Sequence, residues 1–333
     1  DRAQGELARQ MEARMQADSE APALGDDRLR LLFTCCHPSL GSDAQIALTL
    51  REVCGLTTEE IASAFLAKPA TIAQRIVRTK RMIREEGIPY EIPGTAELPG
   101  RLTAVLHVIY LVFNEGYAAS SGARLTRGDL CSEAIELARL LAELLPEPDA
   151  LGLLSLLLLH DARRAARASD TGEVVLLADQ DRSRWDRAQI GEGLSVLRRA
   201  WARPPVGTYT LQAAIAAEHA RAPDSASTDW GAIVRLYDLL LIADRTPVVE
   251  LNRAAAVSEH AGPEAGLVLM DALLARGELR DYRFLHSARA ELLRRLGRHE
   301  EARAAYRRAL ELTAQEPERR FLERRMKEVE ARC

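Results

Sequence analysis

The sequence is poor in aromatic residues, in cysteines and in long apolar segments. Aromatic residues make up only 5% of the 333 residues, whereas Ala, Leu, Arg and Glu dominate. Such a composition favours helices that pack through small residues and leucines. A hydrophobic content of 47% beside 28% charged residues is typical of a globular chain. The sequence therefore predicts an all-α fold, with two domains or one elongated repeat array.

The few cysteines and the short apolar run exclude two classes of protein. An odd number of cysteines without a framework spacing argues against a disulfide-stapled secreted protein. The run LGLLSLLLLH at 151–160 is too short to span a bilayer and predicts a core helix. No N-terminal segment has the pattern of a signal peptide. We therefore expect a cytoplasmic protein without a membrane partner. The cysteines are Cys35, Cys36, Cys54, Cys131 and Cys333.

One segment lacks acidic residues altogether. KPATIAQRIVRTKRMIR, residues 68–84, contains six basic residues and no Asp or Glu, although the whole chain has a formal net charge of -4. Solvated helical faces usually interleave Glu with Lys or Arg, whereas charge of one sign serves a charged partner. The segment therefore points to nucleic acid.

A capped helix precedes the basic segment. Thr57 and Glu60 have the spacing of a capping box, which predicts a short helix from Thr58 to about Leu66. Pro69 suits the first position of a second helix, where its missing N–H leaves no hydrogen bond unmade.

The second helix has two unlike faces. Ile72, Ile76, Thr79 and Ile83 share an apolar face, and polar and basic residues share another; Val77 lies off this pattern. Two helices joined by a three-residue turn predict a helix-turn-helix whose second helix enters the major groove. The candidate DNA-binding residues are Lys68, Thr71, Gln74, Arg75, Arg78, Lys80 and Arg81.

These helices belong to a segment that resembles a known family. Residues 26–91, DDRLRLLFTCCHPSLGSDAQIALTLREVCGLTTEEIASAFLAKPATIAQRIVRTKRMIREEGIPYE, resemble region 4 of an extracytoplasmic-function sigma factor of the sigma-70 family. The subgroup in question has a C-terminal helical-repeat extension, which is similar to YLVFNEGY, LLLLHDARRAAR, LLADQDRSRWDR, TDWGAIVRLYDLLL and LNRAAAV in the rest of this chain.

The resemblance implies a dissociable RNA polymerase subunit whose region 4 reads the −35 promoter element and touches the polymerase flap. By position, Thr71, Gln74, Arg75 and Arg78 would face the −35 bases or adjoining phosphates, with Lys68, Lys80 and Arg81 as backbone contacts. The implied partners are core RNA polymerase, promoter DNA, and region 2 or a regulatory protein bound through the extension. Since no segment here resembles region 2, which melts the −10 element, we expect this chain not to initiate transcription alone.

The last third of the sequence repeats itself. Ala290, Leu293, Gly297, Ala302, Tyr306 and Ala309 have the offsets of a tetratricopeptide-type helical hairpin. A weaker copy places Ala265, Leu269 and Ala272 at the spacing of Ala302, Tyr306 and Ala309, and a third spans Tyr209 to Ala243. Stacked hairpins build concave binding surfaces, so a protein-binding or regulatory role is predicted.

Breaks in the helical pattern divide the chain. The cluster of Pro89, Pro93, Gly94, Pro99 and Gly100 cannot continue a helix and predicts a domain boundary. The predicted parts are a linker remnant at 1–25, the helix-turn-helix domain at 26–88, a Pro/Gly linker at 89–99, a helical extension at 100–205, and tetratricopeptide-like hairpins with a capping helix at 206–333. One segment, EVVLLADQD at 173–181, has a β-like pattern and is the candidate for a short extended piece.

Two metal sites are weighed and set aside. Cys35, Cys36, His37 and Cys54 do not have the two-residue spacing of a zinc knuckle, so a buried, reduced pair is favoured. His107, His160 with Asp161, and Asp179 follow the ligand order of all-helical metal-dependent phosphohydrolases, but neighbouring arginines explain the carboxylates as internal ion pairs. We expect no metal, no cofactor and no catalytic site.

A polar cluster remains open to two interpretations. Asn114 and Glu115 end an apolar helix before Gly116 and need buried partners. They either line a small-molecule pocket or join early helices in a structural network, and the second interpretation is favoured. The residues considered are Asn114, Glu115, His160, Asp161, Asp179, Asp181 and Arg182.

The favoured function is that of an alternative sigma factor whose helical extension regulates or supports its activity. A stand-alone helix-turn-helix regulator with a repeat sensor domain is the first alternative, since LTLREV resembles the opening of LuxR-like motifs. A metal phosphohydrolase is the remote one. Independent operator binding without polymerase would favour the first, and bound metal lost on His160→Ala the second.

Overall fold

A computed structural model describes residues 24–64, 67–94, 96–118, 126–169 and 172–331. The described part is all-α, as predicted, and contains no β-strand. The chain divides into two compact units within helix α6 (Leu98–Tyr117), between Val108 and Ile109. The predicted linker at 89–99 stays a prediction. None of the described helices is long and apolar enough to cross a membrane.

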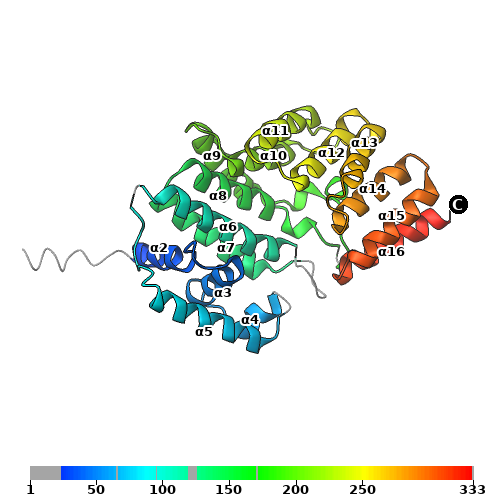
Figure 1. Ribbon diagram of the computed structural model, residues 1–333. Helices are drawn as coiled ribbons and strands as arrows, with labels where there is room; N and C mark the ends of the chain where they lie inside the picture. The colour runs from blue at the N-terminus through cyan, green and yellow to red at the C-terminus, as the bar shows by residue number, and fades with distance from the viewer. Residues whose placement is uncertain (1–23, 65–66, 95, 119–125, 170–171, 332–333) are drawn as a thin grey trace, which may run out of the picture. The chain divides into compact units, whose positions relative to one another are not determined.

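In its described residues, the first unit contains four helices and the start of α6 (Figure 1). They are α2 (Leu24–Cys35), α3 (Ser42–Glu52), α4 (Thr58–Ala64) and α5 (Pro69–Glu85). Helix α3 packs against α2 and α5. The core of the unit contains Phe33, Leu50 and Ile72, each at most 1% exposed. The Arg101 guanidinium of α6 donates to the Phe33 carbonyl at 2.8 Å, which ties α6 to α2.

The predicted capping box at the start of α4 is confirmed. The Thr57 N–H donates to Glu60 Oε2 at 2.7 Å, and the Glu60 N–H donates to Thr57 Oγ1 at 3.2 Å. Two N–H groups that the helix itself cannot satisfy are therefore paired. Helix α5 begins at Pro69, as predicted, with Lys68 in an extended N-cap conformation.

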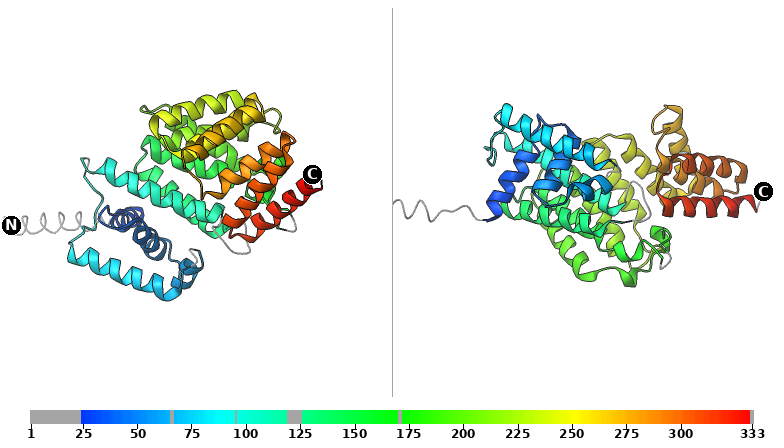
Figure 2. Two further views of the ribbon diagram at one scale, coloured as in Figure 1. Left: turned by 45° about the vertical axis from the view of Figure 1, so that its right-hand side comes forward. Right: turned by 90° about the horizontal axis from the view of Figure 1, so that it is seen from below.

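The second unit consists of helices that pack mainly on their chain neighbours. After α6 come α7 (Gly128–Leu144), α8 (Pro148–Asp161), α9 (Arg187–Trp201), α10 (Thr208–Arg221), α11 (Trp230–Ala243), α12 (Pro247–Ala261), α13 (Pro263–Ala275), α14 (Arg283–Arg295), α15 (His299–Leu312) and α16 (Glu316–Glu330). From α10 to α16 each helix packs on the next. Figure 2 shows α14, α15 and α16 side by side from two further directions.

Helix α8 is buried among the early helices of the second unit. It contains the run at 151–160, whose residues are buried except for the partly exposed His160, and it packs on α7, α9 and α10. Gly152 allows α8 and α10 to approach closely, because a Cβ at this position would lie 2.5 Å from the backbone nitrogen and from Oγ1 of Thr210 on α10. The prediction of a core helix here is confirmed.

The last predicted hairpin is observed with its packing positions buried. Ala290 and Leu293 of α14 and Ala302, Tyr306 and Ala309 of α15 are all at most 1% exposed. Gly297 lies in the loop with φ 72°, a conformation that side chains rarely adopt.

For the weaker copy in α12 and α13, the sequence pattern predicted packing positions that lie one residue before the buried positions of the structure. The buried positions of α13 are Gly266, Leu267, Met270 and Leu273. Ala265 and Leu269 are partly exposed, and Ala272 is exposed. The two hairpins also differ in loop length: only Gly262 separates α12 from α13, whereas three residues separate α14 from α15. The third copy forms a hairpin of α10 and α11.

The segment that follows α8 contacts the last helix of the unit. At 173–181 the structure has a single bridge, between Ala168 and Val174, and a 3-10 turn at Leu177–Asp179, so the extended piece is minimal. Glu173 accepts from Arg324 of α16 at 2.8 Å, across 151 residues of sequence. An ion pair therefore joins an early segment of the second unit to its final helix.

Candidate nucleic-acid interface

Helix α5 presents one face to the core and the opposite face to solvent. Ile72, Ile76 and Thr79 are buried, as their spacing predicts, and the Thr79 hydroxyl donates to the Arg75 carbonyl at 2.8 Å. Because these residues fix the rotation of the helix, the side chains opposite them must point outward. Thr71, Gln74, Arg78 and Arg81 are exposed and form what we term the outer face of α5.

Ion pairs divide the basic residues of α5 into two groups. Arg75 contacts Asp43 of α3 at 3.1 Å, and Lys80 contacts Glu52 of α3 at 2.8 Å. Arg81 contacts Glu85 of its own helix at 3.5 Å. Three further cations, Lys68, Arg78 and Arg84, have no ion pair within the described ranges. They carry the uncompensated positive charge of this helix.

Val77 is an apolar side chain beside the outer face. It is 67% exposed, whereas the isoleucines of α5 lie toward the core. The sequence pattern did not explain this residue, and the packing of the first unit does not use it. An exposed apolar group beside polar ones on a groove-binding helix has the chemistry to contact a thymine methyl.

The comparisons with known proteins assign this domain. Residues 30–83 match the family model described as sigma-70, region 4. The chain carries a sigma-70 region 4 domain. This domain is a non-enzymatic DNA-binding unit, and it points to a sigma-factor-like role with core RNA polymerase and promoter DNA as the implied partners. Residues 101–201 match a family of unknown function (DUF6596).

A full relative extends the likeness beyond region 4. An uncharacterized protein of Rhizobium meliloti (strain 1021) is 47% identical over 298 residues, which cover 89% of this chain and 70% of the relative. The chain belongs to the same protein family as this relative. Region 4 and the helices that follow it therefore occur together in at least two proteins.

The cysteine pair of region 4 lies in its core. Cys35 and Cys36 are at most 1% exposed, and burial raises the pKa of the Cys36 thiol to about 12. Burial likewise raises the pKa of Cys35. Cys36 Sγ lies 3.5 Å from Thr49 Oγ1. Both thiols are therefore protonated packing groups, and no cluster of three metal-ligating side chains occurs among the described residues.

The charged residues of the candidate polar cluster lie in different environments. Asp161 is buried and contacts Arg164 at 3.3 Å, Asp181 accepts from the Ser183 N–H at 2.9 Å, and Asp179 is exposed. The buried Arg182 donates to the carbonyls of His219 and Ala222 at 2.6 and 2.7 Å. Internal contacts thus account for Asp161, Asp181 and Arg182.

Asn114 and His160 are brought together at one cavity of the second unit. Glu115, the neighbour of Asn114, is partly buried and does not line this cavity. His107, which the phosphohydrolase alternative would need as a ligand, is exposed on α6. Sequence reasoning missed Arg163 and Tyr117, which also line the cavity, because nothing in their local pattern marks them.

Proposed function

We propose that this chain is the promoter-recognition part of an extracytoplasmic-function sigma factor whose region 4 reads the −35 element. The observation that supports this most strongly is the outer face of α5 in a domain that matches sigma-70 region 4. Along this helix, Lys68, Arg78 and Arg84 have no carboxylate partner in the described part of the chain. Such cations stabilise a complex with phosphates by releasing counterions from DNA.

The side chains of the outer face suit separate tasks. Thr71 and Gln74 lie in the N-terminal half of α5, where a recognition helix contacts base edges. Gln can donate to and accept from adenine, and a hydroxyl can contact either kind of base pair. We propose that Arg78 and Lys68 contact phosphates, and that Arg75 and Lys80 join them once they leave Asp43 and Glu52 of α3.

We further propose that the helical extension regulates or supports sigma activity through contact with region 2, the polymerase or a regulatory protein, by means of tetratricopeptide-like hairpins. Three observed hairpins, α10 with α11, α12 with α13 and α14 with α15, support this role, because stacked hairpins provide a large binding surface. If truncation of the full-length protein near Pro89 left promoter-directed transcription unchanged, this part of the proposal would be wrong.

The experiment that tests promoter recognition compares two arginine substitutions that change the net charge equally. Arg78→Ala removes an unpaired cation from the outer face, and Arg307→Ala removes an exposed arginine from α15. Duplexes selected from a random pool by the chain with core RNA polymerase are then bound at about 50 to 200 mM salt. We expect Arg78→Ala to weaken binding about three- to ten-fold and to lower the salt slope by about 1, as for one phosphate contact.

Two results would contradict the proposal. Equal effects of Arg78→Ala and Arg307→Ala would show that α5 does not face DNA. Tight binding of a duplex by the wild-type chain alone, with no binding to core RNA polymerase, would instead indicate a stand-alone regulator.

A further inference from the structure

The second unit contains a cavity of about 870 Å³, open to solvent on one side, between its early and late helices. Its lining comes from α6, α8, α10, α11, α12, α14, α15 and α16. This volume is within the range of pockets that hold drug-sized molecules. The cavity lies wholly within the second unit, so it is independent of region 4.

The cavity gathers most of the aromatic side chains of an aromatic-poor chain. The sequence contains only seven tyrosines, five phenylalanines and three tryptophans, yet eight tyrosine and phenylalanine side chains line this cavity. Tyr110, Phe113 and Tyr117 come from α6, and the others come from α11, the α14 region, α15 and α16. Phe113 and Tyr117 are stacked with their ring centroids 5.6 Å apart. Such a lining suits a flat apolar ring.

Unpaired amides accompany the aromatic lining. Asn114 of α6, Gln212 of α10 and Asn252 of α12 all line the cavity. None of their side-chain amides has a hydrogen-bond partner within the described ranges. A few convergent polar groups in a mostly apolar pocket are what orient a bound molecule. The three amides come from three helices and are available to a ligand.

Positive charge is concentrated at the end of the cavity formed by α6 and α8. The Arg163 guanidinium donates to His160 Nδ1 at 3.3 Å and lies 5.6 Å from the centroid of the Tyr117 ring. Arg167 lies 3.5 Å from the same centroid. Neither arginine forms an ion pair with a carboxylate in the described part of the chain. A partly buried cation without a counterion favours an anionic group beside it.

The acidic residues of the lining do not neutralise this end. Glu291 is already held by Arg294 and by the Tyr306 hydroxyl, which donates to it at 3.0 Å. Asp244 is exposed at the end of α11. The nearby histidine supplies no positive charge, because burial, followed by the charges of Arg163, Arg167 and His219, holds the pKa of His160 well below its usual range. Arg163 is thus the cation available in the lining.

We propose that this cavity binds a small molecule that combines a flat apolar ring with one anionic group. The ring lies among the aromatic side chains of α6, α11 and α14, and the anionic group accepts hydrogen bonds from Arg163. The amides of Asn114, Gln212 and Asn252 orient polar substituents. The inference goes beyond promoter recognition and does not depend on it.

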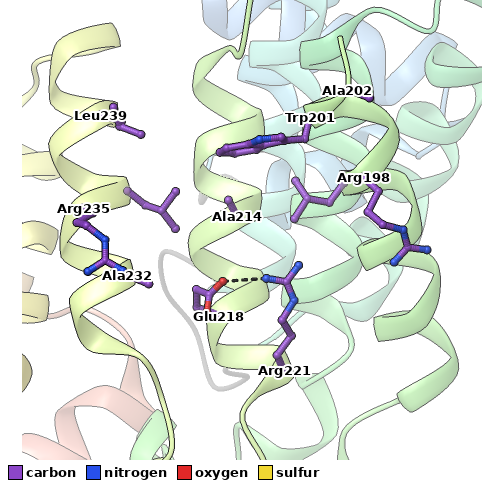
Figure 3. A pocket seen from close by; sticks show the side chains of 11 residues that line it. Arg198, Trp201, Ala202, Ala214, Glu218, Arg221, Ala232, Arg235 and Leu239 are labelled. Atoms are coloured by element: carbon purple, nitrogen blue, oxygen red, sulfur yellow. Dashed lines mark hydrogen bonds and ion pairs between the residues drawn. The ribbon is translucent and has the colours of Figure 1, made fainter. Parts of the chain in front are cut away.

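A second hollow on the same unit provides the matched control. Figure 3 shows a groove between α9, α10 and α11 in which Trp201 and Leu239 lie near Arg198, Arg221 and Arg235. The groove also offers an aromatic ring and arginines, but Trp201 and Leu239 are exposed by 44% and 49%. Arg198→Gln therefore removes an arginine that lines this groove and lies outside the cavity.

The test uses a probe and its neutral counterpart. Isothermal titration of the full chain with 2-naphthoate and with 2-naphthamide compares a carboxylate with an amide on the same ring. We expect saturable 1:1 binding of 2-naphthoate with a dissociation constant at or below about 1 mM, which is the range for a fragment of this size. The amide is expected to bind about ten-fold more weakly, because it lacks the charge-assisted hydrogen bonds.

The variants assign the difference to one residue. Arg163→Gln is expected to weaken 2-naphthoate binding about ten-fold and to leave 2-naphthamide binding unchanged, whereas Arg163→Lys retains the preference for the anion. Arg198→Gln is expected to change neither, and circular dichroism checks that each variant is folded. The proposal is overturned if the wild-type chain does not bind 2-naphthoate saturably. That result would be expected of a surface that binds only peptides. The proposal is also overturned if Arg198→Gln weakens binding as much as Arg163→Gln.

Discussion

Because α8 and α10 are in close contact at Gly152, the effect of substituting this glycine on stability can be predicted from the structure. Substitution by Ala would place a methyl group 2.5 Å from the backbone nitrogen and hydroxyl of Thr210 and 2.8 Å from its Cα. Ordinary van der Waals contact begins near 3.4 Å, so the two helices must separate by close to an ångström. Thr210 is fully buried, and its hydroxyl donates to the Pro148 carbonyl at 3.1 Å, so neither group can move aside freely.

The magnitude follows from two opposing effects. Overpacking of this kind costs about 1–3 kcal/mol, and more where the obstacle is backbone. Replacing Gly by Ala inside a helix returns up to about 1 kcal/mol of helix propensity. We expect Gly152→Ala to lower the free energy of unfolding by about 2 kcal/mol. Gly191→Ala is the matched control: this glycine lies inside α9 with nothing within 4 Å of a Cβ, so the substitution is expected to stabilise by up to about 1 kcal/mol.

The assay is urea denaturation followed by tryptophan fluorescence. The three tryptophans are Trp185, Trp201 and Trp230, all in the second unit, so the signal reports this unit without a contribution from region 4. The midpoint is expected to fall for Gly152→Ala and to rise for Gly191→Ala, with the slope m unchanged. If the two variants were equally stable, α8 and α10 would not be in close contact at Gly152.

Two further predictions use the same assay. Burial, with the charges of Arg163 and Arg182, lowers the pKa of His219 to about 4. Between pH 4 and the ordinary pKa of 6.5, this histidine is protonated in the unfolded chain but neutral in the folded protein. The free energy of unfolding is therefore highest above pH 6.5, and it falls by up to about 3 kcal/mol as the pH is lowered to 4. His219→Gln should reduce this dependence, and an unchanged dependence would refute it. Arg182→Met leaves two carbonyls at the end of α10 without their donor and should cost about 2–4 kcal/mol. Arg184→Met, on an exposed arginine of the same 3-10 turn, should be nearly neutral, and equal losses would contradict the role of Arg182.

The parts of the fold that depend on local chemistry were predictable from the sequence. The start of α4 follows from Thr57 and Glu60, and the start of α5 from Pro69, because both signals act within one helical turn. The hairpin of α14 and α15 was predictable from the spacing of small and large residues. The register of α13 was not, since a shift of one residue changes which positions are buried without changing the spacing of the small and large residues.

In the candidate sites, too, features set by local sequence were predictable and features set by the packing of distant residues were not. Periodicity along α5 predicted which residues face the solvent, and the structure places Thr71, Gln74 and Arg78 there. The pairing of Arg75 and Lys80 with α3 depends on how two helices pack, which no local pattern encodes. The cavity was equally hidden, because its aromatic residues are scattered from Tyr110 to Phe321 and meet only in the folded unit.

The ion pair between Glu173 and Arg324 has a consequence for how this architecture can change in size. An open array of hairpins gains or loses a repeat freely, since each repeat touches only its neighbours. Here the last helix also contacts a segment that precedes the first hairpin. Inserting one more hairpin would carry Arg324 away from Glu173 and break this contact, so closure adds a constraint on the number of hairpins that stacking alone does not impose.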